Sequence, residues 1–124
     1  MKGFGNNDRT KKKAKEKKIN SSQKDTMISN ALLLHSKGKI KEALEIYNLL
    51  IQNKIYDQRI FNNLGSIYSQ IKQFDKAIFF FDESIKQFPK CLEAYSNLAN
   101  VLVAKGRSDA AKNILNKAIE LNPK

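Results

Sequence analysis

Asparagine side chains give this sequence its clearest means of recognising another molecule. Asn62 and Asn63 are adjacent, and Asn97 and Asn100 follow in a second segment of similar composition. A side-chain amide donates and accepts hydrogen bonds at the same time, so it pairs with the backbone of an extended peptide without requiring a charge on the ligand. These four amides are therefore candidates for hydrogen bonds to a ligand, provided that the fold brings them to one surface.

Side chains suited to catalysis or metal binding are few. His35 is the only histidine and Cys91 the only cysteine, whereas a metal site needs several converging ligands. No glycine-rich run ends in Gly-Lys-Ser or Gly-Lys-Thr, as a phosphate-binding loop would require. The aspartates fall mostly at expected helix starts, where capping accounts for them. We therefore expect no enzyme, no metal and no cofactor.

The cellular compartment can be predicted from the cysteine content and from the lack of a membrane-spanning or targeting segment. A single cysteine cannot form an internal disulfide, which fits a reducing environment. No apolar run approaches the ~20 residues that span a bilayer. No hydrophobic segment follows the N-terminal lysines, and Gly3 stands one place too late for myristoylation. We expect a cytoplasmic protein.

A period of 34 residues organises the elements that must position these side chains. Large, small and helix-stopping residues return in the same order, as they do when one structural unit is used several times. The pairs that recur between the second and third units are Phe61/Tyr95, Leu64/Leu98, Gly65/Ala99, Tyr68/Leu102, Ala77/Ala111, Phe81/Leu115 and Pro89/Pro123. A fainter upstream copy contains Met27, Ala31, Leu34, Ala43, Tyr47 and Ile51. Arrays of this kind form binding surfaces.

Each unit is predicted to be a pair of helices. Apolar residues recur at spacings of three and four over residues 60–71 and again over 74–85, with a short polar step between them. Two antiparallel helices joined by a tight turn account for this pattern. The turns are expected to need a positive φ at Gly38, Lys72 and Gly106. The paired helices are expected to approach closely at Ala31, Gly65 and Ala99.

The period and the residue types together resemble the tetratricopeptide repeat (TPR) family. In that frame the repeats run over residues 24–57, 58–91 and 92–124, and residues 1–23 lie outside. The first repeat departs from the family pattern at Asn30, Leu50 and Ile55. The resemblance implies an all-α fold of three helix-turn-helix units, stacked into a short right-handed superhelix that binds a protein or peptide partner.

The resemblance also implies a groove, because the first helix of each TPR lines the concave face of the array. The groove residues carried over from the family pattern are Ile28, Leu32, His35, Arg59, Asn62, Asn63, Ser66, Ser69, Gln70, Glu93, Ser96, Asn97 and Asn100. Ile28 and Leu32 would offer an apolar patch at one end. TPR domains that clamp the C-terminal carboxylate of chaperones have basic residues at the positions of Ile28 and Glu93, so we expect no carboxylate clamp here.

The N-terminal segment differs in composition from the repeats. Residues 1–23 carry eight basic and two acidic side chains, a net charge of 8 − 2 = +6 out of +11 for the whole chain. With few apolar residues, this segment is predicted to be a disordered tail. Its lysines suggest an alternative function, an electrostatic adaptor that binds nucleic acid or an anionic membrane through residues 2–18. A solubilising leader without a partner is the simpler interpretation.

A third function follows from resemblance alone. Some bacterial TPR proteins with a short basic leader continue into a glycosyltransferase or sulfotransferase domain. This chain would then be the N-terminal module, or a short paralogue, of such an enzyme.

Two further surfaces are predicted outside the groove. Phe79, Phe80 and Phe81 are consecutive on a helix and span about 200°, so they cannot all point inward. We expect the third to lie in the core, the second to be partly covered by the next repeat, and the first to be exposed. We also expect the last helix to be uncapped, with Ala110, Ile114 and Leu121 uncovered, and to promote self-association.

Overall fold

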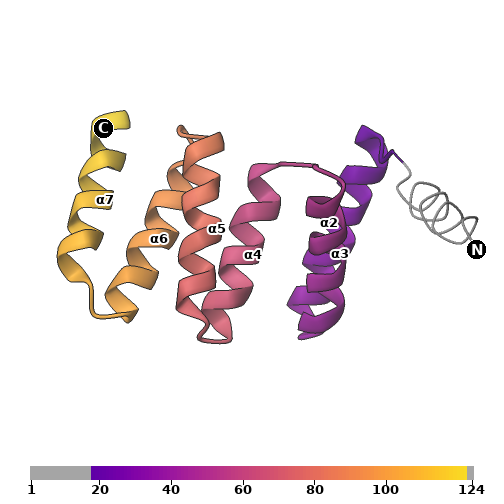
Figure 1. Ribbon diagram of the computed structural model, residues 1–124, viewed down its shortest axis with the longest axis horizontal. Helices are drawn as coiled ribbons and strands as arrows, with labels where there is room; N and C mark the ends of the chain where they lie inside the picture. Colours follow the sequence, from indigo (N-terminus) through magenta and orange to yellow (C-terminus); the bar gives the residue numbers. More distant parts are fainter. Residues whose placement is uncertain (1–17, 123–124) are drawn as a thin grey trace, which may run out of the picture.

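The computed structural model describes residues 18–122, which form six helices and no strand. The helices are α2 (Ser21–Ser36), α3 (Ile40–Gln52), α4 (Gln58–Gln70), α5 (Phe74–Gln87), α6 (Leu92–Ala104) and α7 (Ser108–Leu121). They make three hairpins that stand side by side in chain order (Figure 1). The predicted all-α fold of helix-turn-helix units is confirmed. Most of the predicted tail (residues 1–17), Pro123 and Lys124 lie outside the described residues.

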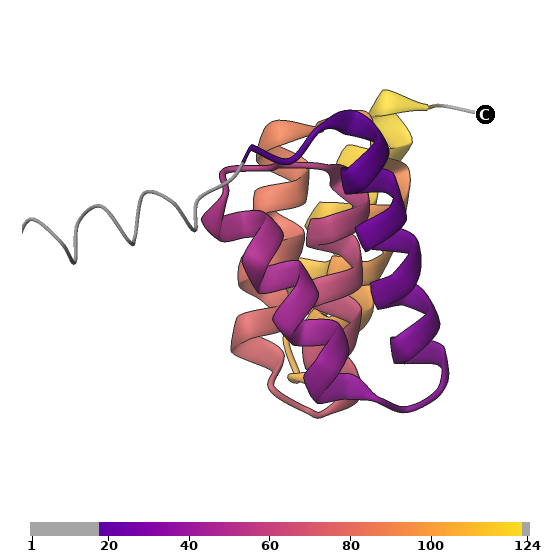
Figure 2. The same cartoon turned by 90° about the vertical axis from the view of Figure 1, so that its right-hand side faces the viewer.

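The first helices of the three hairpins form one layer. Contacts join α2 to α4 and α4 to α6, whereas α3, α5 and α7 make no comparable contacts with one another within residues 18–122. The first helices therefore lie closer together than the second helices, and the array curves around the layer of α2, α4 and α6. Figure 2 looks along the row from the α2 end and shows the hairpins behind one another. No helix of the described part is long and apolar enough to cross a membrane.

The turns have the backbone conformation that the sequence requires. Gly38 and Gly106 adopt φ of +80° and +81°, and Lys72 takes the same role in the second hairpin with φ of +63°. A non-glycine residue in this region costs about 1 kcal/mol. Lys54, which follows α3, also has a positive φ of 59°. The sequence analysis did not identify Lys54, because a lysine gives no local signal for this conformation.

Two hydrophobic clusters hold the hairpins together. Cluster one lies between the first two hairpins and contains Ile28, Ala31, Ala43, Tyr47, Leu50, Ile60, Leu64 and Ile67. Cluster two lies between the second and third and contains Ala77, Phe81, Leu98, Ala99, Val101, Leu102 and Ala111. The close approach expected at Gly65 is present, since a Cβ atom there would lie 2.4 Å from Cε1 of Phe81. The small residue is needed because an aromatic ring lies against the backbone of α4.

The first helix begins earlier than the repeat frame suggested. Ser21 to Gln23, which were assigned to the disordered tail, are the first turn of α2. The Asn20 side chain accepts a hydrogen bond from the Gln23 backbone N–H at 2.8 Å, and the Gln23 side chain accepts one from the Asn20 backbone N–H at 2.9 Å. This reciprocal capping box satisfies two backbone donors at the helix start.

Two expectations about apolar side chains are wrong in detail. Phe80 packs against cluster one and stacks on Tyr68, with ring centroids 5.6 Å apart, so the preceding side of the array covers it and not the next repeat. Ala110 and Ile114 are half-buried against cluster two and are not uncovered. Phe80 and Ile114 each lie one position before the residue that faces the following repeat. One residue corresponds to a rotation of about 100° around the helix axis, so both side chains point toward the preceding part of the array. Phe81 and Phe79 lie as expected, in the core and exposed.

Candidate functional site

The predicted groove residues lie on the concave layer of α2, α4 and α6, and all but two of them are exposed or half-buried. The exceptions are Ile28 and Asn62. Ile28 is 2% exposed and belongs to cluster one, so it cannot supply the apolar patch predicted for it. Leu32, one turn further on, is 50% exposed and remains the apolar residue at that end.

A polar hollow of about 250 Å³ lies between α4 and α6. Ser66, Ser69 and Gln70 line it from α4, and Asn97 and Asn100 line it from α6, with Phe81 and Val101 as its apolar floor. All five polar residues are among those that the sequence placed in the groove. Within the described residues, the side chains of Asn97 and Asn100 make no hydrogen bond to another protein group. Their amides are therefore available to a ligand.

Asn63, by contrast, has a structural role. Its Nδ2 donates a hydrogen bond to the hydroxyl of Tyr47 at 2.9 Å, which links α4 to α3 of the preceding repeat. Burial raises the pKa of the Tyr47 hydroxyl, and the bond from Asn63 partly opposes that effect. Phe81 occupies the position of Tyr47 in the second repeat and has no hydroxyl. Asn97 therefore lacks the partner that Asn63 has.

Asn62 is the second predicted groove residue that is buried in the structure. It is 4% exposed, and its Nδ2 donates to Sγ of Cys91 at 3.3 Å. Its Oδ1 is buried and has no partner among the described residues. Buried polar atoms are nearly always hydrogen-bonded, so this oxygen carries a desolvation cost. Asn62 therefore contributes to the repeat boundary at Cys91 and not to an open binding surface.

His35 bridges the first two repeats on the same layer. Its Nε2 lies 2.7 Å from Oε1 of Gln70, which accepts the hydrogen bond from the ring N–H. The bond joins the end of α2 to the end of α4, 35 residues later. Among the described residues, no group of three histidine, cysteine or acidic side chains is arranged to hold a metal ion. The imidazole therefore acts as a polar link between neighbouring helices.

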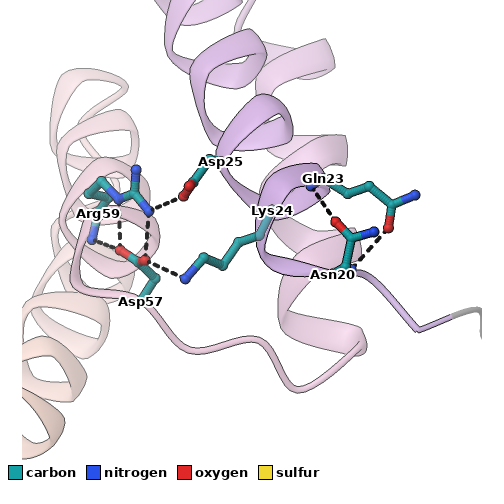
Figure 3. Close-up of polar contacts among 6 residues, drawn as sticks. All are labelled: Asn20, Gln23, Lys24, Asp25, Asp57 and Arg59. Atoms are coloured by element: carbon teal, nitrogen blue, oxygen red, sulfur yellow. Dashed lines mark hydrogen bonds and ion pairs between the residues drawn. The ribbon is translucent and has the colours of Figure 1, made fainter.

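An ion cluster closes the other end of this layer (Figure 3). Arg59 Nη2 lies 2.8 Å from both Asp25 Oδ1 and Asp57 Oδ2, and Lys24 Nζ lies 3.3 Å from Asp57 Oδ2. Asp57 also caps α4, because its Oδ1 accepts the backbone N–H of Arg59 at 2.9 Å. Hydrogen bonding to Arg59 holds the pKa of Asp57 far below its usual range. The charge of Arg59 is thus compensated within the protein.

Removing this carboxylate has a predictable effect on stability. Asp57→Ala deletes the cap of α4 and should lower the free energy of unfolding by about 1–2 kcal/mol at pH 7. A depressed folded-state pKa stabilises the protein above the unfolded pKa of about 4, and the stabilisation is lost as the pH falls toward the folded value. Urea titrations at pH 7 and pH 3 should therefore show a smaller difference between wild type and variant at pH 3. An equal difference at both pH values would contradict the role assigned to this ion cluster.

The fold and the groove define a helical-repeat protein that presents a concave surface. Residues 70–124 match the family profile described as Tetratricopeptide repeat. The chain belongs to the tetratricopeptide repeat family. Its curated relatives include the probable UDP-N-acetylglucosamine–peptide N-acetylglucosaminyltransferase SEC of Arabidopsis thaliana, 30% identical over 76% of this chain, and BBSome complex member BBS4 of Bos taurus, 36% identical over 69%. The chain spans only 10% and 16% of the length of these two proteins, so their activities do not transfer with the similarity.

Solved structures with the same fold align with most of the chain. The type III secretion chaperone SycD of Yersinia enterocolitica, in complex with a peptide of the translocator YopD, is 26% identical with a TM-score of 0.78, and the alignment covers 86% of this chain and 81% of SycD. The first TPR of Spaghetti (RPAP3), bound to the HSP90 peptide SRMEEVD, has a TM-score of 0.76 over 86% of this chain and 84% of that chain. At 21% identity the second similarity supports the fold alone.

Proposed function

We propose that this chain is a protein-interaction module that binds an extended peptide segment of a partner in the hollow between α4 and α6. The observation that carries the proposal is the pair of unengaged amides, Asn97 and Asn100, opposite the hydroxyls of Ser66 and Ser69. These groups donate and accept toward a peptide backbone. SycD, which is 26% identical and shares the fold, binds a peptide of the translocator YopD, and this similarity supports a binding module in preference to an enzyme.

The expected ligand is an uncharged or weakly charged segment. Arg59 is compensated by two aspartates, and Glu93 is exposed at the same end of α6. A C-terminal carboxylate would therefore meet no free cation among these residues and would be repelled by Glu93. Exposed Leu32 and Val103 offer apolar contacts on the first helices at either side of the hollow. The ligand chemistry thus differs from that of the acidic peptide bound by RPAP3.

Replacing the two free amides tests this proposal. Peptides would be selected from a random displayed library against the full chain, and their affinity measured by fluorescence polarisation. Asn97→Ala combined with Asn100→Ala should weaken binding about tenfold, which is ~1.4 kcal/mol, because two hydrogen bonds to the peptide backbone are lost. Asn63→Ala is unsuitable for this test, because it would also break the hydrogen bond to Tyr47.

The matched control is a second pair of asparagines outside the groove. Asn113 and Asn116 are exposed on α7. Asn113→Ala combined with Asn116→Ala removes the same chemistry and should leave the affinity unchanged. Equal effects of the two double variants, or no effect of the groove variant, would contradict binding in the hollow.

A further inference from the structure

One polar side chain of the hollow is hydrogen-bonded from outside it. Gln70, the last residue of α4, lines the hollow together with the two serines of α4 and the two asparagines of α6. Its Oε1 lies 2.7 Å from Nε2 of His35, near the end of α2. Contacts join α2 to α4 and α4 to α6, so His35 and the hollow lie on opposite sides of α4 (Figure 1). Gln70 therefore connects the first repeat to the candidate site.

The hydrogen bond from His35 decides which end of the Gln70 amide a ligand meets. The last torsion of a glutamine side chain has a broad, roughly two-fold preference, so an unrestrained amide presents either its oxygen or its nitrogen. The ring N–H of His35 donates, and it therefore requires the oxygen. Within residues 18–122, Nε2 of Gln70 makes no hydrogen bond to a protein group. The part of Gln70 that remains for a ligand is a donor.

The next pair of repeats lacks this contact. Ser69 and Ala104 follow His35 and Gln70 by 34 residues. Alanine has no polar side chain, so nothing at this position of α6 engages Ser69 as Gln70 engages His35. In the described part of the chain, the Ser69 hydroxyl makes no hydrogen bond to another protein group. The hollow therefore combines one amide whose direction is fixed with a neighbouring hydroxyl that can donate or accept.

We propose that His35 is a positioning residue of the peptide site, which holds Oε1 of Gln70 and so directs the amide N–H groups of Gln70 to a carbonyl oxygen of the ligand. This inference rests on the proposed peptide site between α4 and α6. It adds that the bound segment presents an acceptor at the Gln70 end of the hollow. A segment with an N–H at this point binds less well, because two donors would meet. Fixing the side chain before binding also removes an ordering cost.

Gln70→Glu separates this role from a purely structural contact. The new carboxylate still offers an oxygen to His35, but its second oxygen replaces the N–H groups. Affinity is measured by fluorescence polarisation on the full chain, with an uncharged peptide selected from the library. The variant should melt like wild type, yet it should bind the peptide about tenfold more weakly, because a ligand acceptor would meet another acceptor. A bond that only joined the two helices would leave both properties unchanged.

Two substitutions of His35 test the direction of the contact. The side chain introduced by His35→Lys can only donate, so it keeps the oxygen of Gln70 toward α2. The side chain introduced by His35→Glu can only accept, so it draws the amide nitrogen toward α2 instead. Both variants lose the packing of the imidazole. His35→Glu should therefore bind about fivefold more weakly than His35→Lys, because only the former turns the amide around.

The matched control for these variants adds a charge without changing the contact. Ser36 is exposed and directly follows His35. Ser36→Glu introduces the same negative charge as His35→Glu and Gln70→Glu, and it should leave the affinity for the uncharged peptide unchanged. A loss equal to that of the other two variants would show that charge alone weakens binding, which would overturn the role of His35.

The free protein gives a readout that does not depend on a ligand. His35 is the only histidine of the chain, so its ring signals need no further assignment. In ¹⁵N spectra at pH 8, the ring hydrogen should reside on Nε2 in wild type and in Gln70→Glu. A hydrogen that resides on Nδ1 would mean that Nε2 accepts from Gln70, which would overturn the proposal.

The groove variant Asn97→Ala with Asn100→Ala distinguishes failure of this inference from failure of the proposed function. If that variant weakens binding while Gln70→Glu does not, or while the two His35 variants bind equally, the peptide site stands and the role of His35 is wrong. If the groove variant has no effect, the peptide binds elsewhere, and both the site and the role of His35 are wrong.

Discussion

Phe81→Ala is expected to lower the free energy of unfolding by about 3–5 kcal/mol, the range for removing a fully buried aromatic side chain. Phe81 is 1% exposed, belongs to cluster two, and lies against the backbone of α4 at Gly65. Its loss therefore leaves a cavity between the second and third hairpins. Small domains are stable by only 5–15 kcal/mol, so much of the total stability would be lost. Urea unfolding followed by circular dichroism measures the change.

Phe79 provides the matched control for this variant. It lies two residues earlier on the same helix but is 58% exposed, and its ring makes only an edge contact with Phe80 at 5.2 Å. Phe79→Ala should change the free energy of unfolding by less than about 1 kcal/mol. Similar losses for the two variants would contradict the orientation of α5 in the array.

Gly65→Ala is expected to destabilise the protein by about 1–3 kcal/mol, the usual cost of overpacking a core. The new Cβ would lie 2.4 Å from Cε1 and 2.6 Å from Cζ of the Phe81 ring, which is itself confined by cluster two. Helix propensity acts in the opposite direction, because alanine is favoured over glycine by about 1 kcal/mol in a helix interior. The sign of the measured change therefore decides between packing and propensity.

A second substitution tests the cause of this effect. The third repeat combines alanine and leucine, Ala99 and Leu115, at the positions of Gly65 and Phe81. Phe81→Leu should therefore reduce the cost of Gly65→Ala, so that the double variant is more stable than the sum of the single changes predicts. Gly65→Ala that stabilises the protein, or strict additivity, would show that the ring does not restrict this position.

The fold was predictable because its determinants are local and periodic. Apolar residues at spacings of three and four define each helix, and Gly38, Gly106 and Lys72 mark turns that are visible in the 34-residue alignment of the repeats. The start of α2 was also readable in principle. Asn20 and Gln23 have the spacing of a capping box, and that local signal was outweighed by the repeat frame.

The candidate site was less predictable, because its side chains depend on neighbouring repeats. Asn62 and Asn63 are adjacent and chemically identical, yet one is buried against Cys91 and the other is bonded to Tyr47. Asn97 has no equivalent hydrogen bond, because Phe81 stands at the repeat position of Tyr47 and has no hydroxyl to accept it. These differences arise from partners 16 to 29 residues away, which helical periodicity does not specify.

The most direct test of the central claim is nuclear magnetic resonance of the ¹⁵N-labelled full chain during titration with a library-selected peptide. Binding in the hollow predicts that the side-chain amide signals of Asn97 and Asn100 shift and saturate together, while those of Asn113 and Asn116 stay in place. Shifts confined to α7, or an absence of change at Asn97 and Asn100 when the peptide is bound, would contradict the account.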